Sequence, residues 1–245
     1  MSEFTELLEQ DSPDKDECDF LESYPYLVGL DETGRGALAG PVFVAGCRIE
    51  PSDLESSWIE SIDDSKSLTV GSRKQLASMI QEKADDWIVV GCEPWVIDEQ
   101  GINASIRSCM ETIVSEIATP DGLVVVDGQD ALLGTEPDTI SVVQGDQRFK
   151  SIGAASILAK TERDHFMTHL SFDYPYYEFE DNAGYGTGEH RIALDQEGPS
   201  EIHRVSFSPI SDMSVEFDER SSRHPLASVA VEKHSEPPHY VVKRA

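Results

Sequence analysis

The order of its predicted elements places the 245-residue chain in the α/β class, with helices flanking a central mixed sheet of five strands. Apolar residues recur at helical spacing over 102–118, which is typical of an amphipathic helix with one buried stripe. Residues 122–127 form a continuous apolar run that ends in a carboxylate, as expected of a buried parallel strand. The length is sufficient for one full domain with a sizeable core, or for two small ones.

The remaining elements follow from local patterns along the chain. The other predicted strands are short apolar runs bounded by turn residues: 26–31, 41–49, 86–93 and 140–143. The other predicted helices are 69–83, 151–170 and 187–197. Thr69 is expected to be the N-cap of the first of these helices. The part of the domain after residue 150 is therefore expected to be mainly helical.

Composition divides the chain into three parts. Residues 1–24 are polar and acidic, and we expect them to be disordered. Residues 25–210 hold all the predicted elements and are expected to form one domain. Residues 211–245 contain two consecutive prolines, scattered charges and few aromatic residues, so we expect a largely disordered tail.

The chain is strongly acidic, with 47 Asp and Glu against 19 Lys and Arg and a formal charge of −28. Residues 25–210 carry about −19 of this charge, from 32 acids and 13 bases, so the acidity belongs to the folded body. Scarce lysine with abundant acids is typical of proteins from halophiles, and a generic acidic protein is the alternative. Such a charge argues against nucleic-acid binding, which rests on Lys and Arg. Residues 142–165 nevertheless carry four bases against three acids, which is compatible with a local basic groove.

Cysteine usage and hydropathy indicate a cytoplasmic protein. The four cysteines have no C-x-x-C spacing and are expected to be reduced: Cys18, Cys47, Cys92 and Cys109. No apolar run approaches 18 residues, and the acidic start lacks the pattern of a signal peptide. We therefore expect no contact with a membrane.

Two adjacent carboxylates, Asp31 and Glu32, lie where the first strand meets a glycine-rich turn. Neighbouring strand side chains point to opposite faces, so this pair converges on one point only if the strand ends or twists there. Gly34 and Gly36 allow such a change and also allow a ligand to approach the backbone closely. The pattern indicates a bound cation that faces a polyanionic substrate.

This segment has two simpler interpretations. An acidic turn before glycine is common in acidic chains and explains the carboxylates without chemistry. A dinucleotide-binding loop is disfavoured, because Gly34, Gly36 and Gly40 miss the G-x-G-x-x-G spacing by one residue and a strand follows.

Several motifs occur in a specific order. The first is Leu30-Asp31-Glu32-Thr33-Gly34-Arg35-Gly36 with Leu38-Ala39-Gly40-Pro41-Val42. The others are Asp64-Ser65-Lys66-Ser67-Leu68, Val126-Asp127-Gly128, Gly145-Asp146, Ala154-Ala155-Ser156-Ile157-Leu158-Ala159-Lys160 with Arg163-Asp164, Gly184-Tyr185-Gly186-Thr187, and Ile202-His203-Arg204 with Ser206-Phe207. In this order they resemble the ribonuclease HII family over about residues 26–210. Thr33 and Gln129 stand where that family often has Ala and Asn.

The resemblance implies a ribonuclease H-like fold and makes residues 25–210 the catalytic domain. It implies cleavage of the RNA strand of RNA–DNA hybrids, and cleavage 5′ to single ribonucleotides embedded in duplex DNA. The products would carry 3′-hydroxyl and 5′-phosphate ends, and the biological role would be ribonucleotide removal and RNA-primer clearance. We expect the enzyme to act as a monomer.

The resemblance also implies that four carboxylates are catalytic and bind metal: Asp31, Glu32, Asp127 and Asp164. Two divalent ions about 4 Å apart repel by roughly 4 kcal/mol even at a water-like dielectric, so dense negative charge must hold them. Hard oxygen donors suit Mg²⁺ or Mn²⁺ better than zinc. The residues alone do not show which carboxylate bridges both ions, and the resemblance implies Asp31.

Substrate contacts are implied at three places. The backbone of Gly34-Arg35-Gly36 would read a ribose 2′-hydroxyl, and Tyr185 would stack on the following deoxyribose. Ser65 and Lys66 are expected to grip phosphate. Lys160 and Arg163 are further candidates, for which a role on the helix surface is an equal explanation.

Other interpretations remain open. His165 and His169 have the spacing of a metal pair, but surface or packing roles are favoured, and His203 has no assigned role. A ribonuclease HIII-like enzyme would carry threonine in place of Arg35. A non-cutting hybrid-binding protein would have lost a carboxylate, and a metallophosphoesterase would act on small phosphate esters.

Overall fold

The computed structural model describes residues 16–62, 69–128, 137–213 and 239–243. A six-stranded mixed sheet with the order β5-β4-β1-β2-β3-β6 forms its centre. The strands are β1 (Leu27–Thr33), β2 (Val42–Ile49), β3 (Asp86–Cys92), β4 (Leu123–Asp127), β5 (Asp138–Val142) and β6 (His239–Lys243). Strands β1, β4 and β5 are parallel, whereas β2, β3 and β6 pair in antiparallel fashion.

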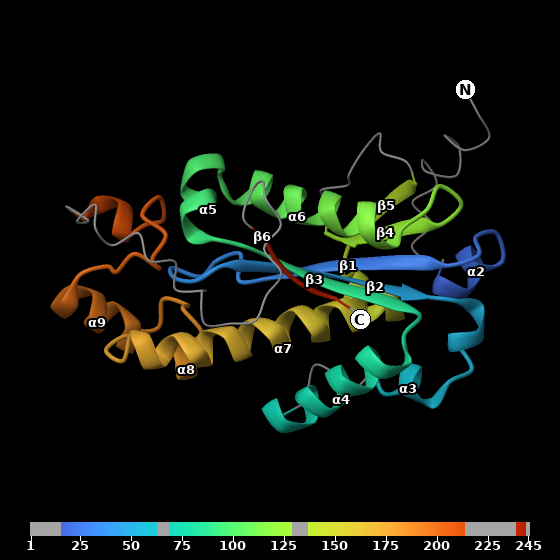
Figure 1. Cartoon of the computed structure of the whole chain (residues 1–245), viewed down its shortest axis with the longest axis horizontal. Helices are drawn as coiled ribbons and strands as arrows, with labels where there is room; N and C mark the ends of the chain where they lie inside the picture. The colour runs from blue at the N-terminus through green and yellow to red at the C-terminus, as the bar shows by residue number, and fades with distance from the viewer. Residues whose placement is uncertain (1–15, 63–68, 129–136, 214–238, 244–245) are drawn as a thin grey trace.

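Helices cover both faces of this sheet. They are α2 (Glu17–Leu21), α3 (Ser57–Glu60), α4 (Val70–Lys83), α5 (Pro94–Gln100), α6 (Ile102–Ile117), α7 (Lys150–Asp173), α8 (Phe179–Asn182) and α9 (Gly188–Glu197). Figure 1 shows α5 and α6 on one face, with α4 and α7 on the other. The predicted cap of α4 is confirmed, because the Thr69 side chain accepts a hydrogen bond from the N–H of Ser72.

The sheet separates two apolar layers. Val28 and Leu30 of β1 pack with the buried stripe of α6, which includes Ile113. On the opposite face, a Cβ atom at Gly29 would collide with the backbone of Ser151 at the start of α7. Glycine at this position therefore lets α7 lie directly against β1, which sets the distance between the helix and the acidic end of that strand.

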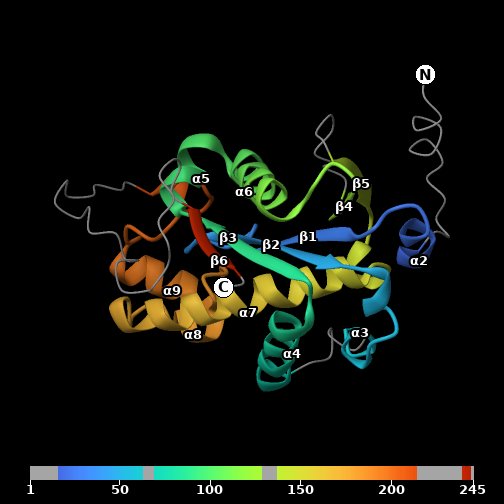
Figure 2. The same cartoon turned by 45° about the vertical axis from the view of Figure 1, so that its right-hand side comes forward.

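The sheet has one strand more than expected. Strand β6 comes from the C-terminal residues that composition assigned to a tail, and it pairs with β3, where Val241 is buried (Figure 2). A three-residue apolar run among charges gives too weak a pattern to predict a strand, but it is sufficient to cover the edge of β3. The short helix α2 likewise forms inside the segment 1–24 that was expected to be disordered. The division into three parts otherwise stays a prediction.

Two further observations concern expectations from composition. No helix in the described part of the chain is long and apolar enough to cross a membrane. All four cysteines are free thiols, and three of them are buried, as expected of reduced core cysteines.

Candidate active site

Asp31 and Asp127 lie side by side at the carboxyl ends of two parallel strands. Strands β1 and β4 are neighbours, and Leu30 pairs with Val126. Asp31 directly follows Leu30 in β1, and Asp127 directly follows Val126 in β4, so the two aspartates lie at the same level along the two strands. The carboxyl end of adjacent parallel strands is where α/β folds commonly place functional groups.

Both aspartates are on the face of the sheet that α7 covers. Asp31 pairs across the sheet with Ala45, which packs among the α7 residues of the core. Asp127 follows Val125 by two residues in β4 and therefore lies on the same face of the sheet, where Val125 packs with Ile152 of α7. The strand pattern thus directs two acidic side chains into the layer between sheet and helix.

The surroundings of Asp31 disfavour its negative charge. Burial raises its pKa to about 7; a hydrogen bond from the Ser156 side chain opposes the shift, while Asp127 and Glu32 add to it by repulsion. Asp31 Oδ1 also accepts the N–H of Glu32 at 2.8 Å, and Asp127 Oδ1 accepts the N–H of Gly145 at 2.7 Å. None of the ion pairs within the described residues reaches Asp31 or Asp127.

Glu32 lies on the opposite face, because β1 continues through Thr33. The expectation that this strand ends at residue 31 is therefore wrong. Glu32 pairs with Val44, which belongs to the layer under α6. Arg35 donates to Glu32 Oε1 at 3.3 Å and to Asn103 Oδ1 of α6 at 2.6 Å. Continued pairing with β2 keeps the strand regular past the carboxylates.

Asp164 extends the same face of α7 beyond the strand ends. Ser156, Lys160 and Asp164 are spaced at i, i+4 and i+8, so they line one side of the helix. Asp164 accepts a hydrogen bond from Lys160 Nζ at 2.7 Å and another from Arg73 Nη1 of α4 at 3.2 Å. Sequence reasoning missed Arg73, because only the packing of α4 against α7 brings it to this carboxylate.

Within the described residues, no three His, Cys, Asp or Glu side chains form a ready-made metal site. In the metal-free protein Asp164 is paired with Lys160 and Arg73, and the Glu32 carboxylate is paired with Arg35. The donor chemistry still fits Mg²⁺ or Mn²⁺, since Asp31 and Asp127 are neighbouring hard-oxygen donors. A bound cation would relieve the repulsion that helps to raise the pKa of Asp31.

Residues 34–40, which we call the glycine loop, follow directly after β1. Gly34 has φ of +89°, a conformation that favours glycine, and its N–H donates to Tyr185 Oη at 3.1 Å. A Cβ atom at Gly34 would collide with Arg163, whereas one at Gly36 would meet nothing within 4 Å. The loop is therefore packed on its inner side and open at Gly36, which suits close approach of a ligand.

Two fully buried arginines hold the glycine loop from below. Arg163 donates to the carbonyl oxygen of Pro41 at 3.1 Å and to that of Ala39 at 3.4 Å. Arg204 donates to Gly40 O at 3.0 and 2.9 Å, and to the carbonyl oxygen of Arg35 at 3.0 Å. Arg163 was grouped with the phosphate-binding candidates, but its long side chain reaches back under the loop. Sequence reasoning found no role for Arg204, although it lies in a matched motif.

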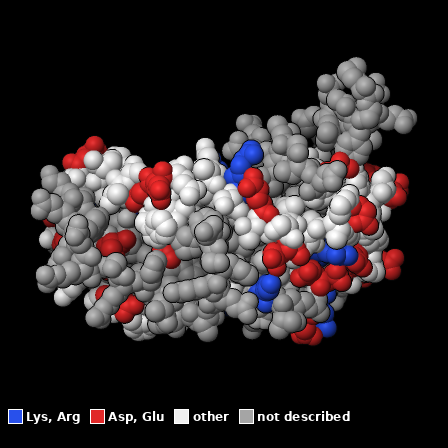
Figure 3. Space-filling model, turned by 45° about the horizontal axis from the view of Figure 1, so that its top comes forward, with Lys and Arg blue, Asp and Glu red and all other residues white. Residues whose placement is uncertain are grey.

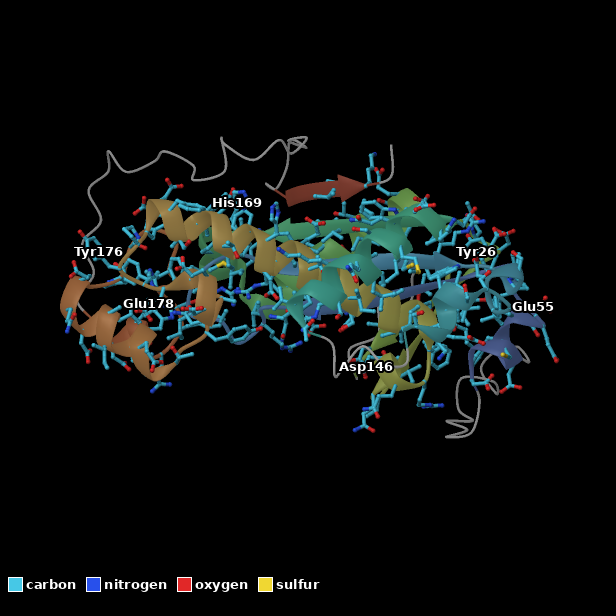
Figure 4. The ribbon with its side chains drawn as sticks, turned by 90° about the horizontal axis from the view of Figure 1, so that it is seen from below. Tyr26, Glu55, Asp146, His169, Tyr176 and Glu178 are labelled. Atoms are coloured by element: carbon cyan, nitrogen blue, oxygen red, sulfur yellow. The ribbon has the colours of Figure 1, made fainter. Side chains whose placement is uncertain are left out.

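The remaining candidates are distributed unevenly. Lys160 Nζ lies 6.0 Å from the centre of the Tyr185 ring, so it is close to the glycine loop. Ser65 and Lys66 lie outside the described residues. His165 and His169 have ring centres 4.3 Å apart, and His169 lies on the part of α7 toward Tyr176, away from Asp146 (Figure 4).

The six-stranded mixed sheet and its flanking helices define the ribonuclease H-like class of fold. The chain's similarity to ribonuclease HII makes it a nuclease that hydrolyses phosphodiester bonds. The family model described as Ribonuclease HII matches residues 28–210, and the chain belongs to this family.

Relatives and solved structures agree with this family. Ribonuclease HII of Clostridium perfringens strain 13 is 39% identical over 184 residues, which cover 75% of this chain and 67% of the relative. Ribonuclease HII of Caldicellulosiruptor bescii is 38% identical over 186 residues, covering 76% and 88% of the two chains. The crystal structure of ribonuclease H2 from Pyrococcus horikoshii OT3 superposes with a TM-score of 0.63 at 25% identity, covering 76% of this chain and 96% of that one.

Proposed function

We propose that this enzyme cleaves the RNA strand of RNA–DNA hybrids and cuts duplex DNA on the 5′ side of a single embedded ribonucleotide. The products carry 3′-hydroxyl and 5′-phosphate ends. The observation that supports this proposal best is the matched register of Asp31 and Asp127 at adjacent parallel strand ends, beside a glycine loop open to a ligand. Family membership supplies the substrate class.

Asp31, Glu32, Asp127 and Asp164 are proposed to hold two Mg²⁺ or Mn²⁺ ions. Bound there, such ions neutralise charge on the phosphate and activate water for attack. Asp31 and Asp127 provide the fixed part of the site, since both are held on the sheet by backbone hydrogen bonds. Asp164 joins from α7, where Lys160 and Arg73 hold it in the metal-free protein.

The glycine loop and Tyr185 are proposed to recognise the sugar. Open space at Gly36 allows the backbone of Gly34-Arg35-Gly36 to approach a 2′-hydroxyl, and the Tyr185 ring stacks on the following deoxyribose. Arg163 supports both features, because its guanidinium lies 5.1 Å from the centre of the Tyr185 ring while it bonds to the loop. Lys160, Ser65 and Lys66 are proposed to contact phosphate.

The decisive experiment uses a DNA duplex with one ribonucleotide, in molar KCl with Mg²⁺ or Mn²⁺. We expect a single cut 5′ to the ribonucleotide, no cut in an all-DNA duplex, and loss of most cutting when fluorine replaces the 2′-hydroxyl. Loop groups that pair with a hydroxyl are left unpaired by DNA, so discrimination of about 10⁴ is attainable.

The same assay separates the rival functions. Cutting of long hybrids without cutting at single ribonucleotides would favour a ribonuclease HIII-like activity. Binding of hybrids without any cut would favour a non-cutting protein, and turnover of small phosphate esters would favour a metallophosphoesterase. Arg35, which bonds to Glu32 and Asn103, is the feature that favours the proposed activity over the ribonuclease HIII-like one.

We further infer that the protein is a cytoplasmic monomer that acts in ribonucleotide removal and RNA-primer clearance. We also infer that its source is a halophile. The formal charge of −28 is the basis for the inference of halophily. Figure 3 shows acidic side chains gathered in patches on one face, with few basic ones between them. A surface of this kind is soluble in molar salt, where like charges are screened.

A further inference from the structure

A pair of buried histidines lies behind Tyr185 and has no role in the proposed chemistry. His190 is at the start of α9, and His203 is in the segment before Arg204; their exposed fractions are 0% and 2%. Their Nε2 atoms are 3.0 Å apart, which is a hydrogen bond between the two rings. The pair therefore joins two segments that both contact the glycine loop.

The neighbouring backbone groups determine which ring nitrogen carries each proton. The N–H of Ser200 donates to His203 Nδ1 at 3.0 Å, so this nitrogen is an acceptor and the proton of His203 is on Nε2. His190 Nε2 then accepts that proton's hydrogen bond. His190 Nδ1 carries the second proton and donates to the carbonyl oxygen of Tyr185 at 3.0 Å. The two rings are thus opposite neutral tautomers in one directed chain.

Aromatic packing keeps the two histidine rings neutral. The ring of Tyr177 lies 4.7 Å from that of His203, and the ring of Phe179 lies 5.5 Å from that of His190. Burial, and then the neighbouring His190, lower the pKa of His203 to about 3, and burial lowers the pKa of His190. A second proton on His190 would be on Nε2 and would face the Nε2–H of His203, whereas a second proton on His203 would be on Nδ1 and would face the N–H of Ser200.

The chain of hydrogen bonds ends at the recognition elements. The carbonyl oxygen of Tyr185 accepts from both His190 and the N–H of Thr187, so two donors fix this peptide group. The hydroxyl of the same tyrosine accepts the N–H of Gly34. On the other branch, His203 forms a bridge with Ala39 of the glycine loop. Tyr185 is therefore held at its backbone by histidine and at its hydroxyl by the loop.

We propose that His190 and His203 are positioning residues that fix Tyr185, and that they set the enzyme's preference for deoxyribose over ribose at the sugar following the embedded ribonucleotide. This inference rests on the proposed function, in which the Tyr185 ring stacks on that sugar. The ring tells the two sugars apart only if its distance from them is fixed, because a 2′-hydroxyl adds a single atom. The carbonyl hydrogen bond from His190 supplies that restraint.

Two matched variants separate positioning from general packing. The amide of His190→Asn reaches the place of Nδ1 and still donates to the Tyr185 carbonyl oxygen. The amide of His190→Gln reaches the place of Nε2, where it pairs with His203 but leaves that carbonyl oxygen without its histidine donor. Both variants bury one amide in the same pocket, so their thermal stabilities are expected to be similar.

The readout is a ratio of cleavage rates for two duplexes that differ only in whether deoxyribose or ribose follows the ribonucleotide. We expect the ratio of His190→Asn to stay within about threefold of wild type, and that of His190→Gln to fall about tenfold, as for one lost hydrogen bond. Equal ratios in the two variants would overturn the proposal. Failure of the wild type to cut either duplex would instead overturn the proposed function.

A spectroscopic measurement on the wild-type protein tests the directed hydrogen bonds through His203 and His190 even if a variant fails to fold. Long-range ¹H–¹⁵N spectra at neutral pH report the tautomer of each histidine. We expect His190 protonated on Nδ1 and His203 protonated on Nε2. The same tautomer on both rings, or a charged ring, would overturn the proposed positioning of Tyr185 by this histidine pair, regardless of any result on cleavage.

Discussion

Two buried carboxylates that hydrogen-bond to α7, Glu17 and Asp31, show how similar burial leads to different electrostatic surroundings. Glu17 is 3% exposed and accepts the N–H groups of Lys150 and Ser151 at 2.8 and 3.0 Å. Asp31 is 9% exposed and lies beside Asp127. One carboxylate meets the positive end of a 24-residue helix, and the other meets negative charge.

Glu17 and Asp31 differ in how their neighbours act on the pKa shift that burial causes. Burial raises the pKa of Glu17, and hydrogen bonds from Ser151 and Lys150 oppose this shift without cancelling it. Burial raises the pKa of Asp31 to about 7, and repulsion from Asp127 and Glu32 adds to the shift. The hydrogen bonds of Glu17 therefore tie α2 to the start of α7, whereas the negative charge of Asp31 is opposed by its neighbours, which suits the cation site that we propose there.

The largest expected effect is on activity. Asp31→Asn and Asp127→Asn remove one charge each with little change of shape, so cleavage should fall by about 10³ or more. In EDTA at pH 8, Asp31→Asn should also melt at a higher temperature than wild type, because repulsion is relieved. Cleavage assays and thermal melts on the same preparations measure both. Near-normal cleavage by either variant would defeat the assignment of these residues as ligands.

The next effect is the pH dependence of stability without metal. The folded-state pKa of Asp31 is about 7, against an ordinary value of 3.8, so the folded chain binds the proton more tightly. The contribution of Asp31 to the free energy of unfolding is therefore expected to be fully present below about pH 4 and to be lost as the pH rises to about 7, by roughly 4 kcal/mol. Urea unfolding in EDTA across this range should show that fall in wild type and a shallower one in Asp31→Asn. Parallel curves would contradict the raised pKa.

Glu17 provides the converse test. Glu17→Gln keeps one acceptor for the start of α7 but loses the charge and the second acceptor, so stability should fall by about 1–3 kcal/mol. Cleavage per folded molecule should not change, because Glu17 is at the far end of α7 from Tyr185. Unfolding and cleavage assays at 25 °C measure the two properties. A tenfold loss of activity with unchanged stability would reverse the roles that we assign to the two carboxylates.

The sequence predicted one of these carboxylates and missed the other for a physical reason. Asp31 follows an apolar run within a motif, and Asp127 ends the most apolar strand, so strand pattern and motif both indicate them. The helix expected over 102–118 is also observed, as Ile102–Ile117. Glu17 lies in a polar segment, and its partners are 133 and 134 residues away in the chain. No local pattern contains such a contact.

The same limit applies elsewhere in the molecule. Strand β6 is defined by the open edge of β3 more than by its own residues. The expected end of the first strand was wrong because cross-strand pairing with β2 outweighs the local preference of a glycine-rich turn. His190 and His203 are 13 residues apart and meet only after α9 has packed. Periodicity and motifs therefore define the sheet and the acidic strand ends, whereas tertiary packing defines how these groups are held.

The smallest expected effect is the influence of salt on the Glu17 variant relative to wild type. About −19 charges on residues 25–210 repel one another, and the Debye length falls to about 3 Å at 1 M, so both proteins should melt at higher temperature in molar KCl than in dilute buffer. The hydrogen bonds of Glu17 are buried and are screened much less than surface pairs. The difference in melting temperature between Glu17→Gln and wild type should therefore stay constant while both values rise. A flat or falling wild-type curve would remove the inference of halophily. A difference that closes with KCl would show that Glu17 acts as a surface charge, and the contrast with Asp31 would then lose its basis.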